Sequence, residues 1–192
     1  MNSPRPLSFS TLTLVLAAVA AVVLGLVTPA AAATPSCGIT WGSQPKVDDG
    51  LSDPGVALTG VRAGRNACYD RLVLDLSRYG GVGGYDVAYA PVVGADGVTV
   101  PLRGAADLRI NLHAPAYDLD GNPTYIVGDP RELVPVGGYR TFRQVAWAGS
   151  FEGYTLLGLG TRARLPFRVS LMSGAPGTPA GARLVIDVAH RW

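Results

Sequence analysis

The chain has 192 residues, of which 16 are Lys or Arg and 14 are Asp or Glu, so its formal net charge is +2. This length is typical of one domain plus a leader. The near balance of charge, with a single lysine and arginines scattered along the sequence, excludes the strongly basic character of most nucleic-acid-binding proteins.

Residues 1–33 have the features of a secretion signal. Arg5 lies in a short start without acidic residues, residues 7–27 are almost wholly apolar, and four alanines occupy positions 30–33. This order is typical of a bacterial signal peptide that is cleaved within the alanine tract. About 20 apolar residues can also span a bilayer, so an uncleaved membrane anchor is the alternative. Either interpretation predicts a secreted or cell-envelope-associated protein.

Residues 34–54 are rich in Pro, Gly, Ser and Asp and predict an irregular lead-in. The chain has two cysteines, Cys37 in this lead-in and Cys68 beyond it. In an oxidising compartment such a pair predicts one disulfide, which would fasten the lead-in to the strand that follows Cys68. Two free buried thiols are the alternative. Two cysteines with two distant histidines are poorly spaced for zinc, and we predict no metal and no cofactor.

Apolar and polar residues alternate from Val56 onward, which is typical of half-buried strands. The predicted strands cover residues 71–76, 85–93, 98–102, 107–113, 142–147, 151–159, 167–171 and 183–188. Residues 95–97 read as a hairpin turn. Residues 114–138 are expected to form a long excursion with one short helix at 130–133. Residues 55–192 are therefore predicted to be one all-β domain of about eight or nine short, mostly antiparallel strands, either a β-sandwich or an open barrel.

One sequence is nearly repeated, as RLVLDL at 71–76 and RLVIDV at 183–188. If the two strands pair antiparallel with Val73 opposite Val185, the arginine of each segment faces the aspartate of the other. Such exposed charge pairs contribute at most about 1 kcal/mol each, so they would select the register more than stabilise the fold. The alternative is that the two segments take equivalent places in different sheets.

Catalytic motifs are sparse. His113 and His190 are the only histidines, and both lie at the ends of predicted strands. Ser150 lacks the strand–turn–helix context of a nucleophile elbow, so we interpret it as a turn residue. We predict no catalytic residue and no enzyme activity. Because a triad assembles in space, a small secreted hydrolase with a cryptic active site is an alternative.

Aromatic residues on predicted strands are the candidate binding residues, because aromatic faces stack on glycans and peptides. These candidates are Tyr85, Tyr89, Trp147 and Tyr154. Three phenylalanines are expected to fill the core: Phe142, Phe151 and Phe167.

Several segments resemble the AMIN-like domain of exported actinobacterial proteins. YDRLVLDL at 69–76, followed by GYDVAY at 84–89, is similar to the opening of that domain. GSFEG at 149–153, followed by LPFRV at 165–169, is similar to its central block, and RLVIDVAH at 183–190 to its closing strand.

The resemblance implies a β-sandwich with a non-catalytic role at the cell envelope. A related module brings some cell-wall amidases to the envelope, so peptidoglycan or another cell-wall glycan is the implied partner. An adaptor that binds an envelope protein is the alternative. The resemblance transfers no binding residues. Nucleic acid is not expected as a partner, and membrane contact is expected only through an uncleaved leader.

Overall fold

The computed structural model describes residues 37–50, 55–77, 84–174 and 181–192. The predicted signal peptide, residues 1–33, lies outside the described residues and stays a prediction. The chain divides into Met1–Pro35 and Ser36–Trp192, and the strands of the described residues all lie in the second unit. Among the described residues, no helix has the length and apolar character needed to cross a membrane.

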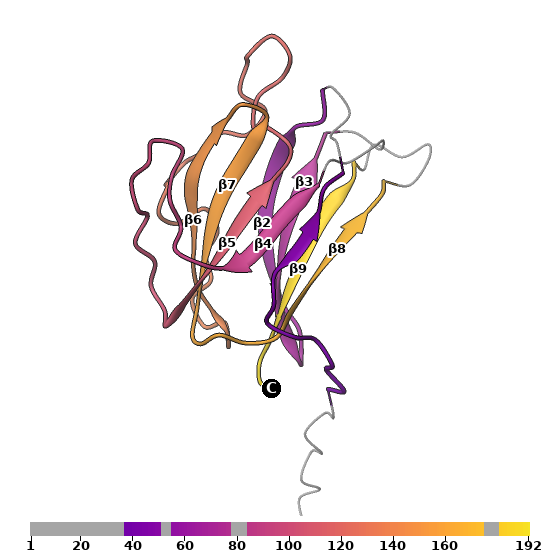
Figure 1. Cartoon of the computed structure of the whole chain (residues 1–192), viewed down its shortest axis with the longest axis vertical. Coiled ribbons are helices and arrows are strands. Elements are labelled where there is room, and N and C mark those ends of the chain that lie inside the picture. Colours follow the sequence, from indigo (N-terminus) through magenta and orange to yellow (C-terminus); the bar gives the residue numbers. More distant parts are fainter. Residues whose placement is uncertain (1–36, 51–54, 78–83, 175–180) are drawn as a thin grey trace, which may run out of the picture. The chain divides into compact units, whose positions relative to one another are not determined.

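Two antiparallel sheets build the domain (Figure 1). Their strands are β1 Lys46–Asp48, β2 Leu58–Arg65, β3 Tyr69–Leu76, β4 Tyr85–Tyr89, β5 Ala106–Leu112, β6 Phe142–Phe151, β7 Tyr154–Thr161, β8 Phe167–Met172 and β9 Arg183–Ala189. One sheet has the order β1-β4-β5-β7-β6 and the other β2-β3-β9-β8. The predicted all-β fold is confirmed, and the architecture is the sandwich rather than the barrel.

The core lies between the two sheets and follows from the alternation in the sequence. Every second residue of a strand points to the same face, so the aliphatic positions of both sheets meet in the middle. Fully buried members include Leu72, Leu74, Leu108, Ile110, Leu157, Leu159, Leu184 and Ile186. Phe142 and Phe167 are also fully buried, as predicted. Burial of this apolar surface is the main favourable contribution to folding.

The repeated segments are neighbours in the second sheet. β3 and β9 pair antiparallel with Val73 opposite Val185, which confirms the predicted register. The guanidinium of Arg71 donates to both carboxylate oxygens of Asp187, at 2.6 and 2.9 Å, and Arg168 of β8 donates a third hydrogen bond at 2.9 Å. The Asp187 side chain is only 1% exposed. The carboxylate of this pair is thus buried and shared with Arg168, whereas the Arg71 side chain is 34% exposed, so the pair is less exposed than predicted.

The other expected charge pair does not form as predicted. The Cα partner of Asp75 is Arg183, yet the Asp75 carboxylate accepts two hydrogen bonds from Arg62 of β2, at 2.6 and 2.8 Å. The register was right, but the prediction did not include the competing arginine on the other neighbour of β3.

The lead-in lies against the second sheet. The ring of Trp41 stacks over the Arg168 guanidinium, with 4.4 Å from guanidinium carbon to ring centroid, and its centroid is 5.6 Å from that of Tyr69. Further along, β1 pairs with β4. A segment predicted to be irregular thus contributes an edge strand to the first sheet.

Prolines shorten the predicted strands around the hairpin turn. β4 ends at Tyr89, two residues before Pro91, and residues 98–102, which contain Pro101, form a loop instead of a strand. Proline has no N–H to donate to a ladder. A turn at the predicted place is present, because the Gly94 N–H donates to the Val98 carbonyl at 2.8 Å.

The helix predicted at 130–133 is wrong. Asp129 begins a turn whose carbonyl accepts the Glu132 N–H at 3.2 Å. The Trp147 N–H donates to the Pro130 carbonyl at 2.7 Å, and the Leu133 N–H donates to the Val145 carbonyl at 2.9 Å. The segment therefore covers the outer edge of β6, which would otherwise expose unpaired backbone groups.

The loop between β4 and β5 packs on the outer face of β7 because two glycines let it approach. A Cβ at Gly160 would overlap the carbonyl oxygen of Arg103, and one at Gly158 would lie 2.9 Å from the Leu102 side chain. Gly158 and Gly160 have the Gly-x-Gly spacing found in phosphate-binding loops. Here their role is to let the loop backbone contact the sheet.

Gly160→Ala is expected to lower the free energy of unfolding by about 1–3 kcal/mol, because the new methyl group meets a backbone atom that cannot rotate away. Urea denaturation measures the change. Gly64→Ala is the matched control, since it is also a strand glycine and a Cβ there has nothing within 4 Å. A Gly160→Ala protein as stable as the Gly64→Ala protein would contradict the tight approach of the loop.

Candidate functional site

The four candidate aromatic residues divide between two environments. Tyr85 and Tyr89 lie on β4 and pack against the core. The Tyr89 hydroxyl donates to the Leu165 carbonyl and accepts from the Leu165 N–H, both at 3.0 Å. Burial raises the pKa of both tyrosines, and the nearby Asp48 carboxylate raises that of Tyr85 further. Tyr89 is thus occupied in joining β4 to the loop before β8.

Trp147 and Tyr154 lie at the β6–β7 hairpin, together with Phe151. The hairpin turns through Glu152 and Gly153, whose φ angles are 50° and 85°. Positive φ at both central positions is the type I′ geometry that matches the twist of paired strands, and glutamate rarely adopts it. The last strand pair before the turn is Phe151 and Tyr154. Their side chains are 62% and 44% exposed. The prediction that Phe151 fills the core is therefore wrong.

Ser150 holds this hairpin in place. Its hydroxyl accepts the Ala116 N–H at 2.9 Å, donates to the Tyr154 carbonyl at 2.9 Å, and lies 3.1 Å from the Thr155 hydroxyl. From the other side, the Gly153 N–H donates to the Tyr117 hydroxyl at 3.1 Å. These hydrogen bonds of the Ser150 hydroxyl stabilise the hairpin, which agrees with the interpretation of Ser150 as a turn residue.

Two adjoining depressions lie beside the hairpin, and we call them together the hairpin groove. The larger, of about 540 Å³, is lined by Gly94, Ala95, Asp96, Val98, Val100 and residues 147–151. The smaller, of about 220 Å³, is lined by Ala95, Asn111, Phe151, Glu152, Tyr154 and Leu156. Ala95 and Phe151 line both, so the two depressions adjoin. It presents aromatic faces beside one amide and two carboxylates.

Asn111 is one of the polar residues that line the groove. Within the described part of the chain, its Oδ1 atom is buried and has no hydrogen-bond partner. Arg109, two residues earlier on β5, has a buried Nε atom in the same condition, although its Nη2 atom contacts Asp86 at 3.2 Å. Leaving such buried polar atoms without a partner is unfavourable.

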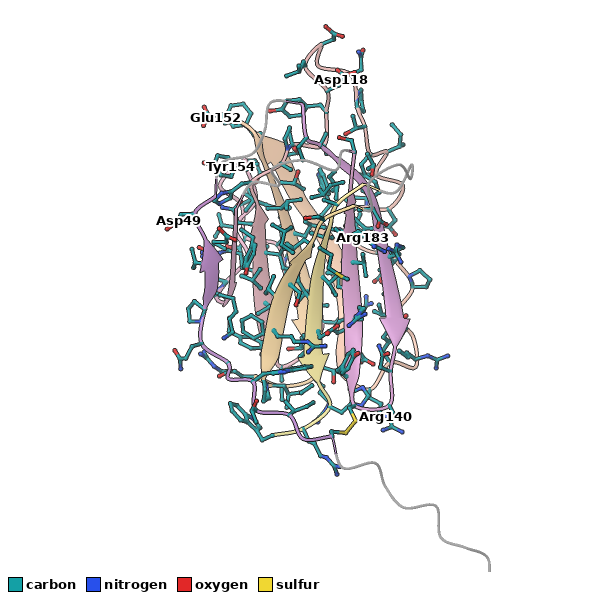
Figure 2. All side chains as sticks on the ribbon, turned by 90° about the vertical axis from the view of Figure 1, so that its right-hand side faces the viewer. Asp49, Asp118, Arg140, Glu152, Tyr154 and Arg183 are labelled. Carbon is teal, nitrogen blue, oxygen red and sulfur yellow. A yellow bond between two sulfur atoms is a disulfide. The ribbon has the colours of Figure 1, made fainter. Side chains whose placement is uncertain are left out.

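The excursion also contains an acidic turn close to the hairpin end (Figure 2). The Asp118 carboxylate accepts the backbone N–H groups of Asp120 and Asn122, at 3.0 and 2.8 Å, as well as the Asn122 side-chain amide. These hydrogen bonds, led by the Asn122 side chain, lower the pKa of Asp118. The carboxylate therefore shapes its own turn.

A family model described as the AMIN-like domain matches residues 56–190. The chain belongs to the AMIN-like domain family. No curated protein and no solved structure matches it significantly. Membership associates this AMIN-like domain with cell-wall-related targeting or binding, the role of a non-catalytic module. Together with the disulfide described next, it indicates an exported protein of the cell envelope.

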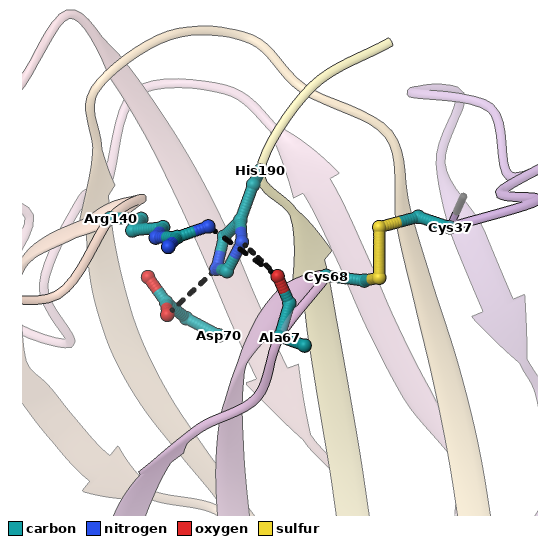
Figure 3. The surroundings of a disulfide bond; sticks show 6 residues. All are labelled: Cys37, Ala67, Cys68, Asp70, Arg140 and His190. Atoms are coloured by element: carbon teal, nitrogen blue, oxygen red, sulfur yellow. Dashed lines mark hydrogen bonds and ion pairs between the residues drawn. A yellow bond between two sulfur atoms is a disulfide. The ribbon is translucent and has the colours of Figure 1, made fainter. Parts of the chain in front are cut away.

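At the end opposite the hairpin groove, a disulfide fastens the lead-in to the AMIN-like domain (Figure 3). Cys37 and Cys68 are bonded, with their Cα atoms 5.6 Å apart, as predicted. The bridge closes a sequence separation of 31 residues and ends one position before β3. It therefore keeps the residues around Trp41 close to the second sheet.

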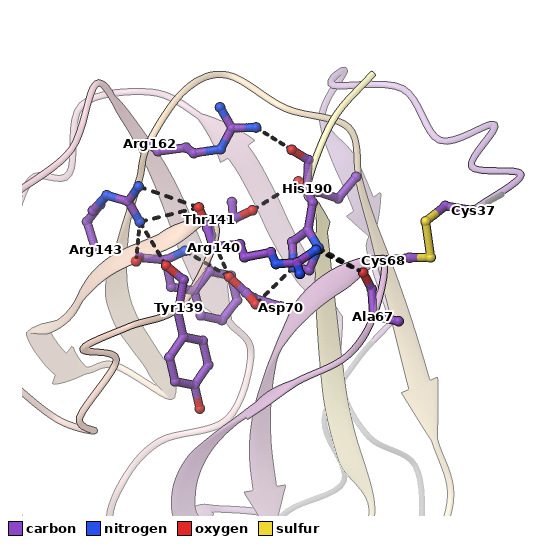
Figure 4. A network of polar contacts seen from close by, with 12 residues as sticks. Cys37, Ala67, Cys68, Asp70, Tyr139, Arg140, Thr141, Arg143, Arg162 and His190 are labelled. Atoms are coloured by element: carbon purple, nitrogen blue, oxygen red, sulfur yellow. Dashed lines mark hydrogen bonds and ion pairs between the residues drawn. A yellow bond between two sulfur atoms is a disulfide. The ribbon is translucent and has the colours of Figure 1, made fainter. Parts of the chain in front are cut away.

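A buried carboxylate organises the same end of the AMIN-like domain (Figure 4). Asp70 is fully buried and accepts the N–H groups of Thr141 at 2.6 Å and Phe142 at 3.2 Å. His190 lies with Nε2 at 3.1 Å from Asp70 and Nδ1 at 3.2 Å from the Ala67 carbonyl. The imidazole thus joins the end of β9 to the start of β3, while His113 packs edge-on against the Tyr154 ring.

Proposed function

We propose that this AMIN-like domain binds a cell-wall glycan, peptidoglycan in the first instance, through the hairpin groove. The observation that carries the proposal is that Phe151, Tyr154 and Asn111 line one depression. Flat aromatic faces stack on the apolar faces of sugar rings, and amide and carboxylate groups bind their hydroxyl and amide substituents. Family membership supports the same class of partner.

The hairpin gives the groove a rigid base. Its aromatic residues flank a two-residue turn that is held by Ser150 and Tyr117. A preformed surface loses little conformational entropy on binding, so modest stacking contacts suffice for measurable affinity. The adjoining depression along residues 94–100 extends the surface and suits a ligand longer than one sugar.

The test is retention of the protein on purified peptidoglycan at physiological salt. We expect Phe151→Ala/Tyr154→Ala to weaken retention about tenfold, because two stacking contacts of about 0.5–1.5 kcal/mol are removed. Val47→Ala/Met172→Ala is the control, since those side chains are similarly exposed but do not line the groove. No retention of the unmodified protein, or equal loss in both double variants, would count against the proposal.

A further inference from the structure

Arginines that are scattered along the sequence gather at one end of the domain, which we call the arginine end. They come from the end of β2, the segment around the start of β6, the loop after β7 and the residues after β9, and are Arg65, Arg140, Arg143, Arg162, Arg164 and Arg191. All but Arg143 are classed as exposed. Figure 4 shows several of them around the disulfide and His190.

Most of these positive charges have no carboxylate partner. In the described ranges, Arg65, Arg140, Arg143, Arg162 and Arg164 form no ion pair. Their guanidinium groups bind backbone carbonyls or aromatic rings instead. Arg162 donates to the His190 carbonyl, Arg164 to that of Ser43, and Arg65 lies 5.7 Å from the centroid of the Tyr139 ring. Because these carbonyl groups and rings are neutral, they do not compensate the positive charge of the guanidinium groups.

Acidic residues concentrate at the other end. Asp118 and Glu152 lie near one end of the long axis, and Arg140 lies at the other (Figure 2). In the described residues of the arginine end, Asp107 at the start of β5 is half-buried and Asp70 is fully buried against His190. Glu132, beside Arg143, is paired with Arg103. A net charge of only +2 therefore conceals a strong charge asymmetry. Such an asymmetry orients a protein in an electric field.

An exposed tryptophan accompanies the arginines. Trp192 is 71% exposed, and its indole N–H donates to the Arg164 carbonyl at 3.3 Å. Tryptophan with neighbouring arginine is the side-chain combination favoured at the boundary between lipid headgroups and water. A soluble polyanion would benefit from the arginines alone, so Trp192 favours a membrane surface.

We propose that the arginine end docks on an anionic phospholipid surface. The opposite end of the domain, which carries the β6–β7 hairpin, then faces away from the bilayer. The attraction comes from the arginines and does not require an apolar leader. Each arginine near such a surface changes the partition by about fivefold. The sequence suggested no basic cluster because these residues become neighbours only when both sheets are assembled.

The test is sedimentation of the full chain with vesicles, in phosphatidylcholine alone and with added phosphatidylglycerol. All variants are prepared with the same N-terminus, so any leader contributes equally. Arg65→Gln/Arg140→Gln is expected to reduce binding to the anionic vesicles about 20-fold. The control Arg62→Gln/Arg183→Gln removes the same charge around Asp75, away from Arg140 (Figure 2), and is expected to keep most of the binding. Denaturation midpoints of both proteins verify that they fold.

Preference for anionic vesicles that is lost in the first variant and kept in the control supports the proposal. Equal loss in both variants would overturn it, because net charge alone would then explain binding. Binding that is the same with neutral vesicles would also overturn it. Soluble polyphosphate that binds as tightly as the anionic vesicles would overturn the membrane as the partner.

Discussion

Asp70→Ala is expected to lower the free energy of unfolding by about 3–5 kcal/mol. The Asp70 carboxylate is fully buried and accepts two backbone N–H groups, from Thr141 and Phe142, while it contacts His190. Alanine would leave both N–H groups buried without acceptors and would remove the partner of the imidazole. Urea denaturation followed by far-UV circular dichroism measures the loss.

Asp75→Ala provides the matched control on the same strand. Its carboxylate also accepts two hydrogen bonds, from Arg62, but the two side chains are 30% and 55% exposed. Water replaces the lost contacts, so we expect a change of at most about 1 kcal/mol. If both substitutions reduced stability equally, burial would not be what makes Asp70 important.

Loss of the disulfide is expected to have an effect of similar size. Replacing both Cys37 and Cys68 with serine should lower the free energy of unfolding by about 3–4 kcal/mol, because the unfolded chain regains the entropy of a loop of 31 residues. The same change frees the lead-in, whose Trp41 stacks on Arg168. Denaturation in the presence and absence of a thiol reductant measures the effect.

The double serine variant also controls for the reductant. Its denaturation midpoint should be the same with and without the thiol, whereas that of the unmodified protein should fall on reduction. A loss below about 1 kcal/mol would mean that the lead-in packs on the sheet without help from the bridge.

The fold was predictable where strands carry alternating residues and matched charges. The β3–β9 register followed from the repeat, because a shift of one residue would move Leu72 and Leu184 out of the core. The disulfide followed from cysteine count and expected compartment. β1 was not predictable, because Lys46–Asp48 is too short to show a period. The loop at 98–102 was misassigned, since its valines resemble a strand that Pro101 prevents.

The candidate site was less predictable, because it depends on how β6 and β7 pair next to their hairpin turn. Phe151 has the residue type of a core position, but the register of β6 shifts between Trp147 and Gly149 and pairs Phe151 with the exposed Tyr154. The Glu-Gly pair between Phe151 and Tyr154 was the available signal. Asn111 gave no signal, because its missing partner is a property of the assembled surface.

The position of β9 has a consequence for how the protein is made. It comes after the other eight strands of the described residues in sequence, yet it lies inside its sheet, between β3 and β8. The hydrogen bonds between Arg71 and Asp187 join residues 116 positions apart. Until the residues of β9 have been synthesised, β3 can pair only with β2, and β8 has no partner strand in the sheet. Such non-local closure is slow, so the second sheet is completed late in folding.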